Sequence, residues 1–305
     1  MILVDYNNVV MTNIFALSKE VAAAKGVDDV KNIIRHIFVT TVLSYKSKFS
    51  AKYGKIVICA DSKMNWRKSI FPEYKANRKT ARDKSDLNWK LIFQCMSDLK
   101  SEIHDIYTWP IIEADYLEGD DVIAILSRMK TETTPADNFF GSSELNKEKT
   151  LIISSDGDMK QLHSKTVDQW SPMTKDFVKQ GSDWSLSEKI AKGDQGDGVP
   201  NIFCGDTWLV EKTEGQRAKP VTKKIVAELD KYLETGIITE SFDPQIIRNI
   251  FRNRVMVDLS CIPDKYVSEI ESKFKNYDII GSKDKMMKLF ISVGASQLFA
   301  RIHEV

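Results

Sequence analysis

Short apolar runs alternate with longer stretches of helical periodicity over the first half of the chain. We interpret four of these runs as strands: residues 2–4, 55–60, 103–108 and 150–154. The first, second and fourth are apolar without alternation, which is typical of a parallel sheet covered on both faces. Three intervening stretches have one apolar helical face: residues 30–49, 89–99 and 120–129. This order predicts an α/β fold, a mostly parallel central sheet flanked by helices, over residues 1–185.

The second half of the chain has no comparable strand signal. Residues 221–233 and 244–256 have helical spacing instead. We therefore predict a smaller, mainly α-helical domain over residues 186–305. The polar segment 131–149 stands between the helical stretch 120–129 and the apolar run 150–154. It contains a proline and a glycine, and we predict a surface loop there.

The composition is that of a well-packed globular protein. Of 305 residues, 42% are apolar and 29% are charged, which excludes collagen-like and wholly disordered chains. No stretch approaches the ~18 apolar residues of a spanning helix, so we expect no membrane segment. Asp5 follows the apolar start at once and no basic segment precedes it, so we expect no signal peptide. Four dispersed cysteines favour a reducing, cytoplasmic location over a disulfide framework or a zinc site.

Acidic residues follow several of the apolar runs. In an open parallel sheet, residues just past the carboxyl ends of the strands meet in one crevice, where ligands bind. The acids in such positions, together with those that open a helical run or stand on a glycine-rich loop, are Asp5, Asp61, Glu118, Asp120, Asp121, Asp156, Asp158, Asp194 and Asp197. Taken singly, an aspartate after a strand is most often a turn or helix cap.

The combination of these acids points to metal ions. Two carboxylates ~4 Å apart repel each other by about 4 kcal/mol at an effective dielectric constant of 20. A crevice with five or more must therefore raise several pKa values or hold cations. Oxygen ligands without histidine or cysteine favour Mg²⁺ or Mn²⁺, and two such ions are a standard device for phosphodiester cleavage.

Other chemistries lack their sequence signatures. Gly193, Gly196 and Gly198 do not follow a strand, so neither a dinucleotide-binding loop nor a P-loop is supported. Ser154 and Ser155 stand in no GxSxG elbow, which argues against a serine hydrolase.

Positive charge is concentrated in blocks although the net charge is only +1. Residues 62–90 contain nine Lys and Arg against three acids, and a second group consists of Arg217, Lys219, Lys223 and Lys224. The first block is most simply a solvated basic helix. Beside a metal crevice, however, a cationic segment with an aromatic side chain can hold a phosphate backbone and stack a base.

The ordered motifs resemble the 5′-nuclease (flap endonuclease) family. They are Asp5, Asp61, FPEYKANRK at 71–79, EGDD at 118–121, IISSDGD at 152–158 and GDQGDG at 193–198. Within the family, the chain most resembles the RNase H (5′→3′ exonuclease) of T-even bacteriophages. This further similarity lies in residues 151–158, 161–163, 169–173 and 211–217. The resemblance covers nearly the whole chain.

The resemblance implies a role for each matching residue. Asp5, Asp61, Glu118, Asp120 and Asp156, with the adjacent Asp121, match the acids around a first metal ion, and Asp158, Asp194 and Asp197 match those around a second. A helical arch around residues 62–92 would place Lys75 and Arg78 on the scissile phosphate as catalytic cations, with Tyr74 beside them for stacking on a base. The second basic group (Arg217, Lys219, Lys223 and Lys224) falls within the helix–turn–helix module that grips duplex DNA.

The implied function is metal-dependent 5′→3′ exonuclease and flap endonuclease activity on RNA–DNA and DNA duplexes, removing RNA primers during lagging-strand replication. The cofactors would be two Mg²⁺ ions, with Mn²⁺ as a substitute. The protein would be a monomer in the host cytoplasm, with a single-stranded-DNA-binding protein as a candidate partner. Two departures from the family pattern matter. The insertion at 204–220 does not support the module's potassium site, and the early position of Asp5 does not support a sliding-clamp contact.

Two other functions remain as alternatives. One is a related metal-dependent RNA nuclease, which the segment 71–79 and the second domain disfavour. The other is a non-catalytic protein that binds DNA structures. Such a protein would be expected to lose acids, whereas the set here is complete.

Overall fold

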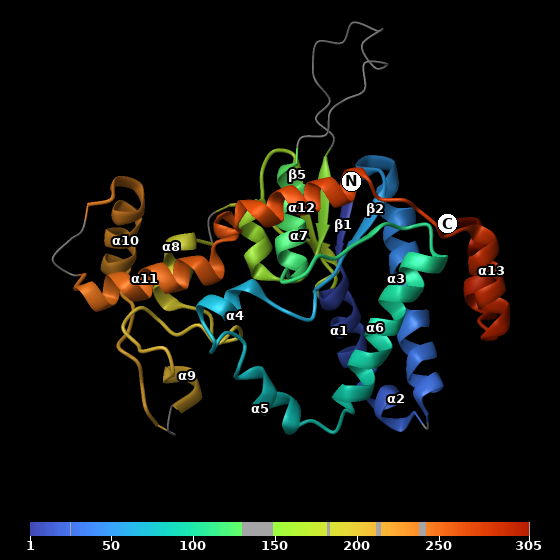
Figure 1. Cartoon of the computed structure of the whole chain (residues 1–305), viewed down its shortest axis with the longest axis horizontal. Helices are drawn as coiled ribbons and strands as arrows, with labels where there is room; N and C mark the ends of the chain where they lie inside the picture. The colour runs from blue at the N-terminus through green and yellow to red at the C-terminus, as the bar shows by residue number, and fades with distance from the viewer. Residues whose placement is uncertain (25, 130–148, 182–183, 212–214, 238–241, 305) are drawn as a thin grey trace, which may run out of the picture. The chain divides into compact units, whose positions relative to one another are not determined.

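The computed structural model describes residues 1–24, 26–129, 149–181, 184–211, 215–237 and 242–304. The chain divides into two compact units, each discontinuous in sequence (Figure 1). Unit 1 consists of Met1–Lys63, Asp86–Gln180 and Asp264–Val305, and unit 2 of Met64–Ser85 and Gly181–Pro263. The segment predicted as an arch thus belongs largely to unit 2, and the last helices belong to unit 1. The predicted loop at 131–149 lies, apart from Lys149, outside the described residues.

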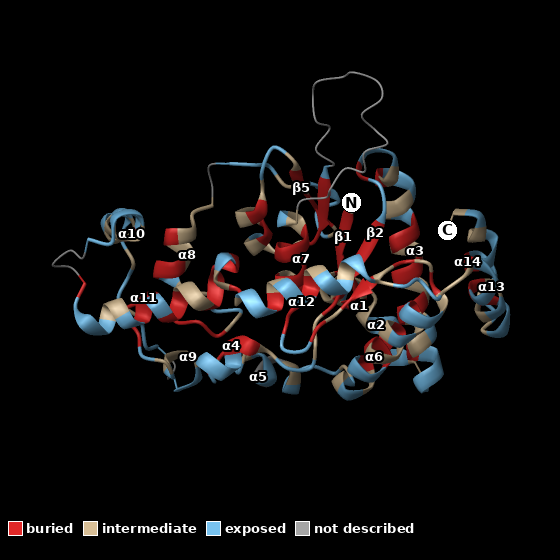
Figure 2. Cartoon of the chain, turned by 45° about the horizontal axis from the view of Figure 1, so that its top comes forward, coloured by how far each residue is buried: buried red, intermediate tan, exposed pale blue. Residues whose placement is uncertain are grey.

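A six-stranded sheet forms the centre of unit 1. Its strands are β1 (Ile2–Asp5), β2 (Ile56–Cys59), β3 (Ile111–Ile112), β4 (Thr150–Ile153), β5 (Val167–Ser171) and β6 (Asp176–Phe177), in the order β3-β2-β1-β4-β5-β6. All neighbours are parallel except β5 and β6. Every residue of β1, β2 and β4 is buried, which explains their unbroken apolar runs (Figure 2). The predicted parallel sheet is confirmed.

The helices of unit 1 pack on its sheet or on one another. They are α1 (Tyr6–Ala16), α2 (Ser18–Ala23), α3 (Val27–Tyr53), α6 (Trp89–Ile106), α7 (Gly119–Arg128), η2 (Gly157–Leu162), α12 (Asp264–Lys275), α13 (Lys283–Ser292), α14 (Ser296–Ala300) and η4 (Ile302–Glu304). The apolar face predicted for α3 is buried through Ile34, Phe38 and Val42. α3 packs on β1 and α6, whereas α7 packs on β1 and β2. In the described part of the chain, no helix is both long and apolar enough to cross a membrane.

One predicted strand is wrong. Residues 103–106 form the last turn of α6, and only 107–108 lie beyond the helix. Ile103 continues the buried face that Cys95 and Leu99 begin, at helical spacing. A window of six residues was too short to distinguish this spacing from strand alternation. β5 was missed because Asp168 and Gln169 interrupt its apolar positions.

Unit 2 is mainly helical, as predicted. Its elements are α4 (Trp66–Ile70), α5 (Arg78–Asp83), α8 (Leu186–Lys192), α9 (Trp208–Glu211), α10 (Lys223–Thr235), α11 (Pro244–Val257) and η3 (Leu259–Cys261). One apolar cluster joins Phe71 and Tyr74 to Ile190, Leu229 and Ile250. This cluster explains why residues 64–85 belong to unit 2, far along the chain from its other residues.

A buried guanidinium holds α11 to the loop before α9. Arg252 is 6% exposed and donates hydrogen bonds to the carbonyl oxygens of Cys204 and Pro200. Its Nη1 lies 2.6 Å from Asp206 Oδ1, and Arg248 binds the same carboxylate. The hydrogen bond from Arg248, followed by the contribution of Arg252, lowers the pKa of Asp206 to about 2. Asp206 is therefore the anion that balances the buried charge.

We predict that Asp206→Asn lowers the free energy of unfolding by up to ~3 kcal/mol, because it leaves Arg252 buried without its carboxylate. The pKa of Asp206 falls from 3.8 to about 2 on folding. Its stabilisation is therefore present above pH ~4 and is lost as the pH falls through about 2. Urea titrations between pH 7 and pH 2 measure this loss. Arg248→Ala removes a partner that is 51% exposed and should cost less than ~1 kcal/mol. Equal losses in the two variants would contradict the account.

Candidate active site

Three carboxylates stand at the carboxyl ends of adjacent strands. Asp5 ends β1, Asp61 follows β2 by two residues, and Asp156 follows β4 by three. Because β1 lies between β2 and β4, the sheet brings the three acids to one edge. The predicted convergence of Asp5, Asp61 and Asp156 at the strand ends is therefore present in unit 1.

Asp5 is the most buried acid of this group, with 5% of its surface exposed. Its Oδ1 accepts a hydrogen bond from the backbone N–H of Asn8 at 2.9 Å, and its Oδ2 accepts one from Ser154 Oγ at 2.8 Å. Burial raises the pKa of Asp5 to about 7, and the charges of Asp61 and Asp156 add to the increase. The two hydrogen bonds only partly oppose it. The buried carboxylate is thus short of compensating positive charge.

Asp61 is anchored by neutral donors. Asn7 Nδ2 lies 2.6 Å from its Oδ2, and the backbone N–H of Gly119 lies 2.7 Å from its Oδ1. A Cβ at residue 119 would stand 3.2 Å from both Asp61 Oδ1 and the carbonyl oxygen of Cys59. Glycine therefore allows the start of α7 to approach the end of β2 closely.

The acids at the start of α7 have different roles. Asp121 is fully buried, and its Oδ2 accepts the backbone N–H of Glu118 at 3.1 Å in a capping box. This contact gives Asp121 a structural function. The charge of Asp120 affects the end of β2. Burial raises the pKa of the Cys59 thiol, and the charges of Asp5 and then Asp120 raise it further. Glu118, at 7% exposure, is buried beside them.

Asp156 and Asp158 lie at the start of η2. Asp156 is its N-cap, and its Oδ1 accepts the backbone N–H of Asp158 at 2.8 Å. Both side chains are partly buried. The charge of Asp156 reaches Asp5, as the pKa of Asp5 shows. Asp156, at the start of η2, therefore adds negative charge near Asp5, the last residue of β1.

The donor set fits a hard divalent cation. The available donor atoms are carboxylate oxygens, which hard divalent cations prefer. The raised pKa of Asp5 indicates that a cation beside it would relieve the repulsion between the acids. Among the described residues, no three His, Cys, Asp or Glu side chains already close around a single point. The carboxylate oxygens of Asp5 and Asp61 accept the hydrogen bonds described above. An oxygen that accepts one hydrogen bond keeps a second lone pair with which it could bind a cation, so these bonds can orient the two side chains.

The acids of the glycine-rich loop belong to unit 2. Asp194 Oδ2 accepts a hydrogen bond from Lys189 Nζ at 2.6 Å. Although burial acts in the opposite direction, this bond and neighbouring backbone amides hold the pKa of Asp194 below its usual value. Asp197 Oδ1 pairs with Arg78 Nη2 at 2.5 Å, and its Oδ2 lies 3.5 Å from Lys75 Nζ. The carboxylate of Asp197 thus gathers the two cations predicted for the arch.

Two expectations about the arch segment are corrected. Tyr74 is 2% exposed, and its hydroxyl donates to Asp197 Oδ2 at 2.9 Å, so its ring is not available for stacking on a base. Lys75 has φ of 58° and lies between α4 and α5, so the helix expected around residues 62–92 is interrupted there. Its backbone N–H donates to the Asp197 carbonyl oxygen at 2.7 Å. Packing of 71–78 against the loop 193–198 replaces the predicted helical geometry.

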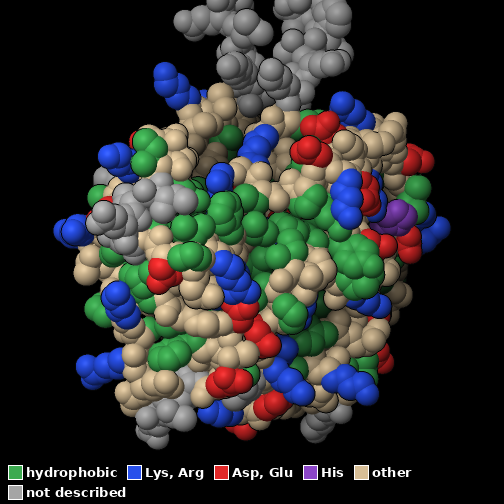
Figure 3. All heavy atoms as spheres, turned by 60° about the vertical axis from the view of Figure 1, so that its left-hand side comes forward, with side chains coloured by type: hydrophobic (Ala, Val, Ile, Leu, Met, Phe, Trp, Pro, Cys, Tyr) green, Lys and Arg blue, Asp and Glu red, His purple; other side chains and the backbone are tan. Residues whose placement is uncertain are grey.

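The second basic group is exposed on unit 2. Lys223 and Lys224 open α10 behind the N-cap Thr222, whereas Arg217 and Lys219 precede it. Lys219 Nζ lies 4.4 Å from the centroid of the Phe203 ring. On the face in Figure 3, Lys and Arg side chains are scattered among acidic and apolar ones. We therefore expect discrete phosphate contacts rather than a uniformly basic surface.

Several residues around the acids were missed from the sequence. Asn7 and Asn8 bind the carboxylate of Asp61 and the backbone of Ser155, respectively. Lys100 Nζ donates to the Asp61 carbonyl oxygen at 2.8 Å. The two asparagines that follow Asp5 after Tyr6 were a signal that could have been used. Lys100, on α6, carried none.

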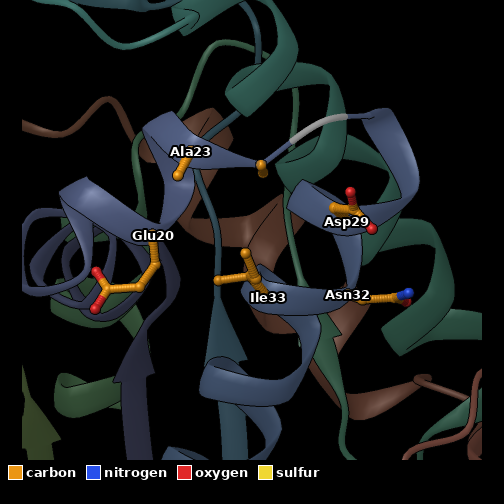
Figure 4. Close-up of a pocket in the computed structure, with 6 residues that line it drawn as sticks. Glu20, Ala23, Asp29, Asn32 and Ile33 are labelled. Carbon is orange, nitrogen blue, oxygen red and sulfur yellow. The ribbon is translucent and has the colours of Figure 1, made fainter.

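A separate hollow of about 480 Å³ lies between α2 and α3. Figure 4 shows Ile33 in the middle of its lining residues, with Glu20 on one side and Asp29 with Asn32 on the other. Ala23 and Ala24 complete the lining. None of the strand-end acids lines it, so it is not part of the candidate active site.

Comparison with known proteins agrees with this geometry. Residues 1–190 match the 5′-3′ exonuclease, N-terminal resolvase-like domain, and residues 181–305 match the T4 RNase H C-terminal domain. The chain is 30% identical over 282 residues to the ribonuclease H of Enterobacteria phage T4, covering 90% of this chain and 87% of that protein.

Solved structures share the fold. Bacteriophage T5 5′-exonuclease with bound zinc has a TM-score of 0.55 at 18% identity, covering 96% of this chain and 97% of that one. A T5 flap endonuclease complex with DNA and metal ions has a TM-score of 0.54 at 16% identity, covering 96% and 98% of the two chains. With its parallel sheet, strand-end acids and two matching domains, the chain belongs to the 5′-3′ exonuclease family of nucleases, with a C-terminal domain of the T4 RNase H type.

Proposed function

We propose that this nuclease uses Mg²⁺ to hydrolyse RNA–DNA hybrids and 5′ flaps, and that it removes RNA primers during DNA replication. The observation that carries the metal dependence is the burial of Asp5 near the charges of Asp61 and Asp156, which its two hydrogen bonds offset only in part, so that its pKa is raised to about 7. The substrate class is supported by the similarity to phage T4 ribonuclease H over most of both chains.

Divalent cations, when bound, would supply a water of lowered pKa and offset charge on the leaving oxygen. The residues that would hold a first ion are Asp5, Asp61, Glu118, Asp120 and Asp156. Asn7 and Gly119 orient Asp61 by hydrogen bonds to its carboxylate, and Asn8 Oδ1 accepts the backbone N–H of Ser155, next to Asp156. We further propose that Lys75 and Arg78 offset negative charge on the phosphoryl oxygens.

The substrate proposal is tested with a 5′-labelled RNA primer on a DNA template and a 5′-flap DNA of equal length. With Mg²⁺, we expect short RNA products from the first and release of the flap strand from the second. A chain that cleaves the DNA flap and leaves the hybrid intact would remove primer processing from the proposed function. Cleavage of neither substrate, with duplex binding retained, would favour a non-catalytic DNA-structure-binding protein.

Duplex binding should depend on discrete cations of unit 2. Each phosphate contact contributes roughly −0.9 to the slope of log K against log salt concentration. We predict that combining Lys223→Ala and Lys224→Ala flattens this slope by up to about two units. Lys231→Ala, an exposed lysine near the other end of α10, is the control and should leave the slope unchanged. Fluorescence anisotropy in EDTA measures binding, and an unchanged slope in the double variant would place the duplex site elsewhere.

A further inference from the structure

Gln169, on β5, is a buried polar side chain beside the strand-end acids, with 2% of its surface exposed. Its Nε2 lies 2.9 Å from the Ser154 carbonyl oxygen and 2.8 Å from the Asp156 carbonyl oxygen. Both carbonyls belong to the short segment that leads from β4 to η2. The amide of Gln169 therefore clamps the backbone on both sides of Ser155.

The orientation of this amide is determined by its partners. Since Nε2 donates to two carbonyl oxygens, Oε1 must be the acceptor in the contact with His163 Nε2 at 2.8 Å. His163 therefore carries a proton on Nε2 and donates it to Gln169. Burial lowers the pKa of His163, which favours this neutral form. His163 thus supports Gln169 through Oε1, the amide atom that does not contact the Ser154 and Asp156 carbonyl oxygens.

The clamped segment touches two of the proposed metal ligands. Ser154 is fully buried; its Oγ donates to Asp5 Oδ2 at 2.8 Å and accepts the backbone N–H of Asp156 at 3.1 Å. The backbone N–H of Ser154 donates to the Trp170 carbonyl oxygen at 3.1 Å. A shift of this segment would therefore move Asp156 directly and alter the hydrogen bond to Asp5.

We propose that Gln169 is a positioning residue that sets Asp156, and through Ser154 also Asp5, for binding of a divalent cation, with His163 as its outer support. The inference rests on the proposed metal-dependent function. Hydrogen-bonding partners behind metal ligands typically change metal affinity or activity by 10–100-fold when they are removed, roughly the range expected here.

The chain offers a matched control in Gln180. Its Nε2 also bonds two backbone carbonyl oxygens, those of Ser164 and Val167, at 2.9 and 3.0 Å. These carbonyls are not in the segment that carries Asp156. Gln180 is exposed whereas Gln169 is buried, so the two variants are compared by the Mn²⁺ affinity of the folded protein and not by their stability. A loss of affinity confined to the Gln169 variant is the result expected of a positioning clamp.

The test measures binding of Mn²⁺ alone to the full chain, by isothermal titration and electron paramagnetic resonance, without nucleic acid. We expect Gln169→Met to raise the Mn²⁺ Kd about 10–100-fold while Gln180→Met retains the native value. In cleavage assays at a fixed Mg²⁺ concentration, Gln169→Met should lower kcat and leave the KM for the nucleic acid unchanged. Near-ultraviolet circular dichroism establishes that each variant is folded.

A second pair of variants leaves Gln169 in place, in case Gln169→Met does not fold. His163→Ala should weaken Mn²⁺ binding, and His163→Gln, which can donate to Gln169 Oε1, should restore it. Native Mn²⁺ affinity in folded Gln169→Met, or in His163→Ala, would overturn the positioning role while leaving the metal-dependent function standing. Absence of Mn²⁺ binding by the native chain would overturn both.

Discussion

Asp5→Asn is expected to lower cleavage by more than ~100-fold, beyond the effect typical of residues behind a metal ligand. In EDTA it should also increase the free energy of unfolding. The native carboxylate is 5% exposed and lies near the charges of Asp61 and Asp156. Asparagine keeps an acceptor for the Asn8 amide but carries no charge. A substitution that lowers activity but raises stability is typical of a residue that serves function at a cost in stability.

The pH dependence gives the sign of this stability effect. The pKa of Asp5 rises from 3.8 to about 7 in the folded, metal-free chain. The contribution of Asp5 to stability is therefore fully present below pH ~4 and is lost as the pH rises through about 7. The advantage of Asp5→Asn should grow across this range by at most about 1.4 kcal/mol for each unit of pKa shift. Urea titrations at several pH values measure it.

Asp168→Asn is the control for Asp5→Asn. Asp168 lies on β5, where its Oδ2 accepts a hydrogen bond from the Tyr53 hydroxyl at 2.6 Å and lies 3.6 Å from Lys52 Nζ. Its partners are a donor and a cation, so neutralising it should not stabilise the protein. If Asp5→Asn lost stability as Asp168→Asn is expected to do, the crowding of like charges at the strand ends would be contradicted.

Lys75→Ala is expected to lower kcat by about 10²–10³-fold, the range for loss of one charge-stabilising donor. kcat/KM should fall by a similar factor, since the interaction is proposed for the transition state. The side chain is 17% exposed and lies 3.5 Å from Asp197 Oδ2, so salt should screen it little. Single-turnover rates at low and high salt measure the effect.

The alternative for Lys75 is a purely structural ion pair with Asp197. Lys79→Ala, an exposed lysine of α5, controls for loss of basic charge in the same segment. A loss in Lys75→Ala that is below ~10-fold and disappears at high salt, as in Lys79→Ala, would remove Lys75 from the chemistry. Tyr74→Phe should reduce stability by about 1 kcal/mol, through the lost hydrogen bond to Asp197, and leave the rate intact.

The sequence was sufficient where one physical signal dominated. Fully buried strands leave unbroken apolar runs, so β1, β2 and β4 were predicted, and with them the edge where Asp5, Asp61 and Asp156 meet. Ile103 was misassigned because burial on one face of α6 leaves an alternation that a short window cannot resolve.

Contacts between segments far apart in the chain could not be predicted from the sequence. Nothing in the sequence around Gly198 indicates that this residue must lack a side chain. The reason lies in a distant segment, since a Cβ at residue 198 would stand 2.9 Å from the Glu73 carbonyl oxygen. That close approach brings Asp197 to Arg78 and buries Tyr74, so the predicted stacking surface does not form. The role of Gln169 could likewise not be predicted, since it depends on the carbonyl oxygens of Ser154 and Asp156 to which its amide donates.

The most direct test of the metal-dependent account is cleavage of a pre-bound 5′-flap duplex in a single turnover. Enzyme and labelled duplex are mixed in EDTA, and excess Mg²⁺ then starts the reaction. We predict no product before Mg²⁺ is added, rapid cleavage afterwards, and a rate more than ~100-fold lower for Asp156→Asn at native duplex affinity. Cleavage in EDTA, or a native rate in Asp156→Asn, would contradict the assignment of the strand-end acids as metal ligands.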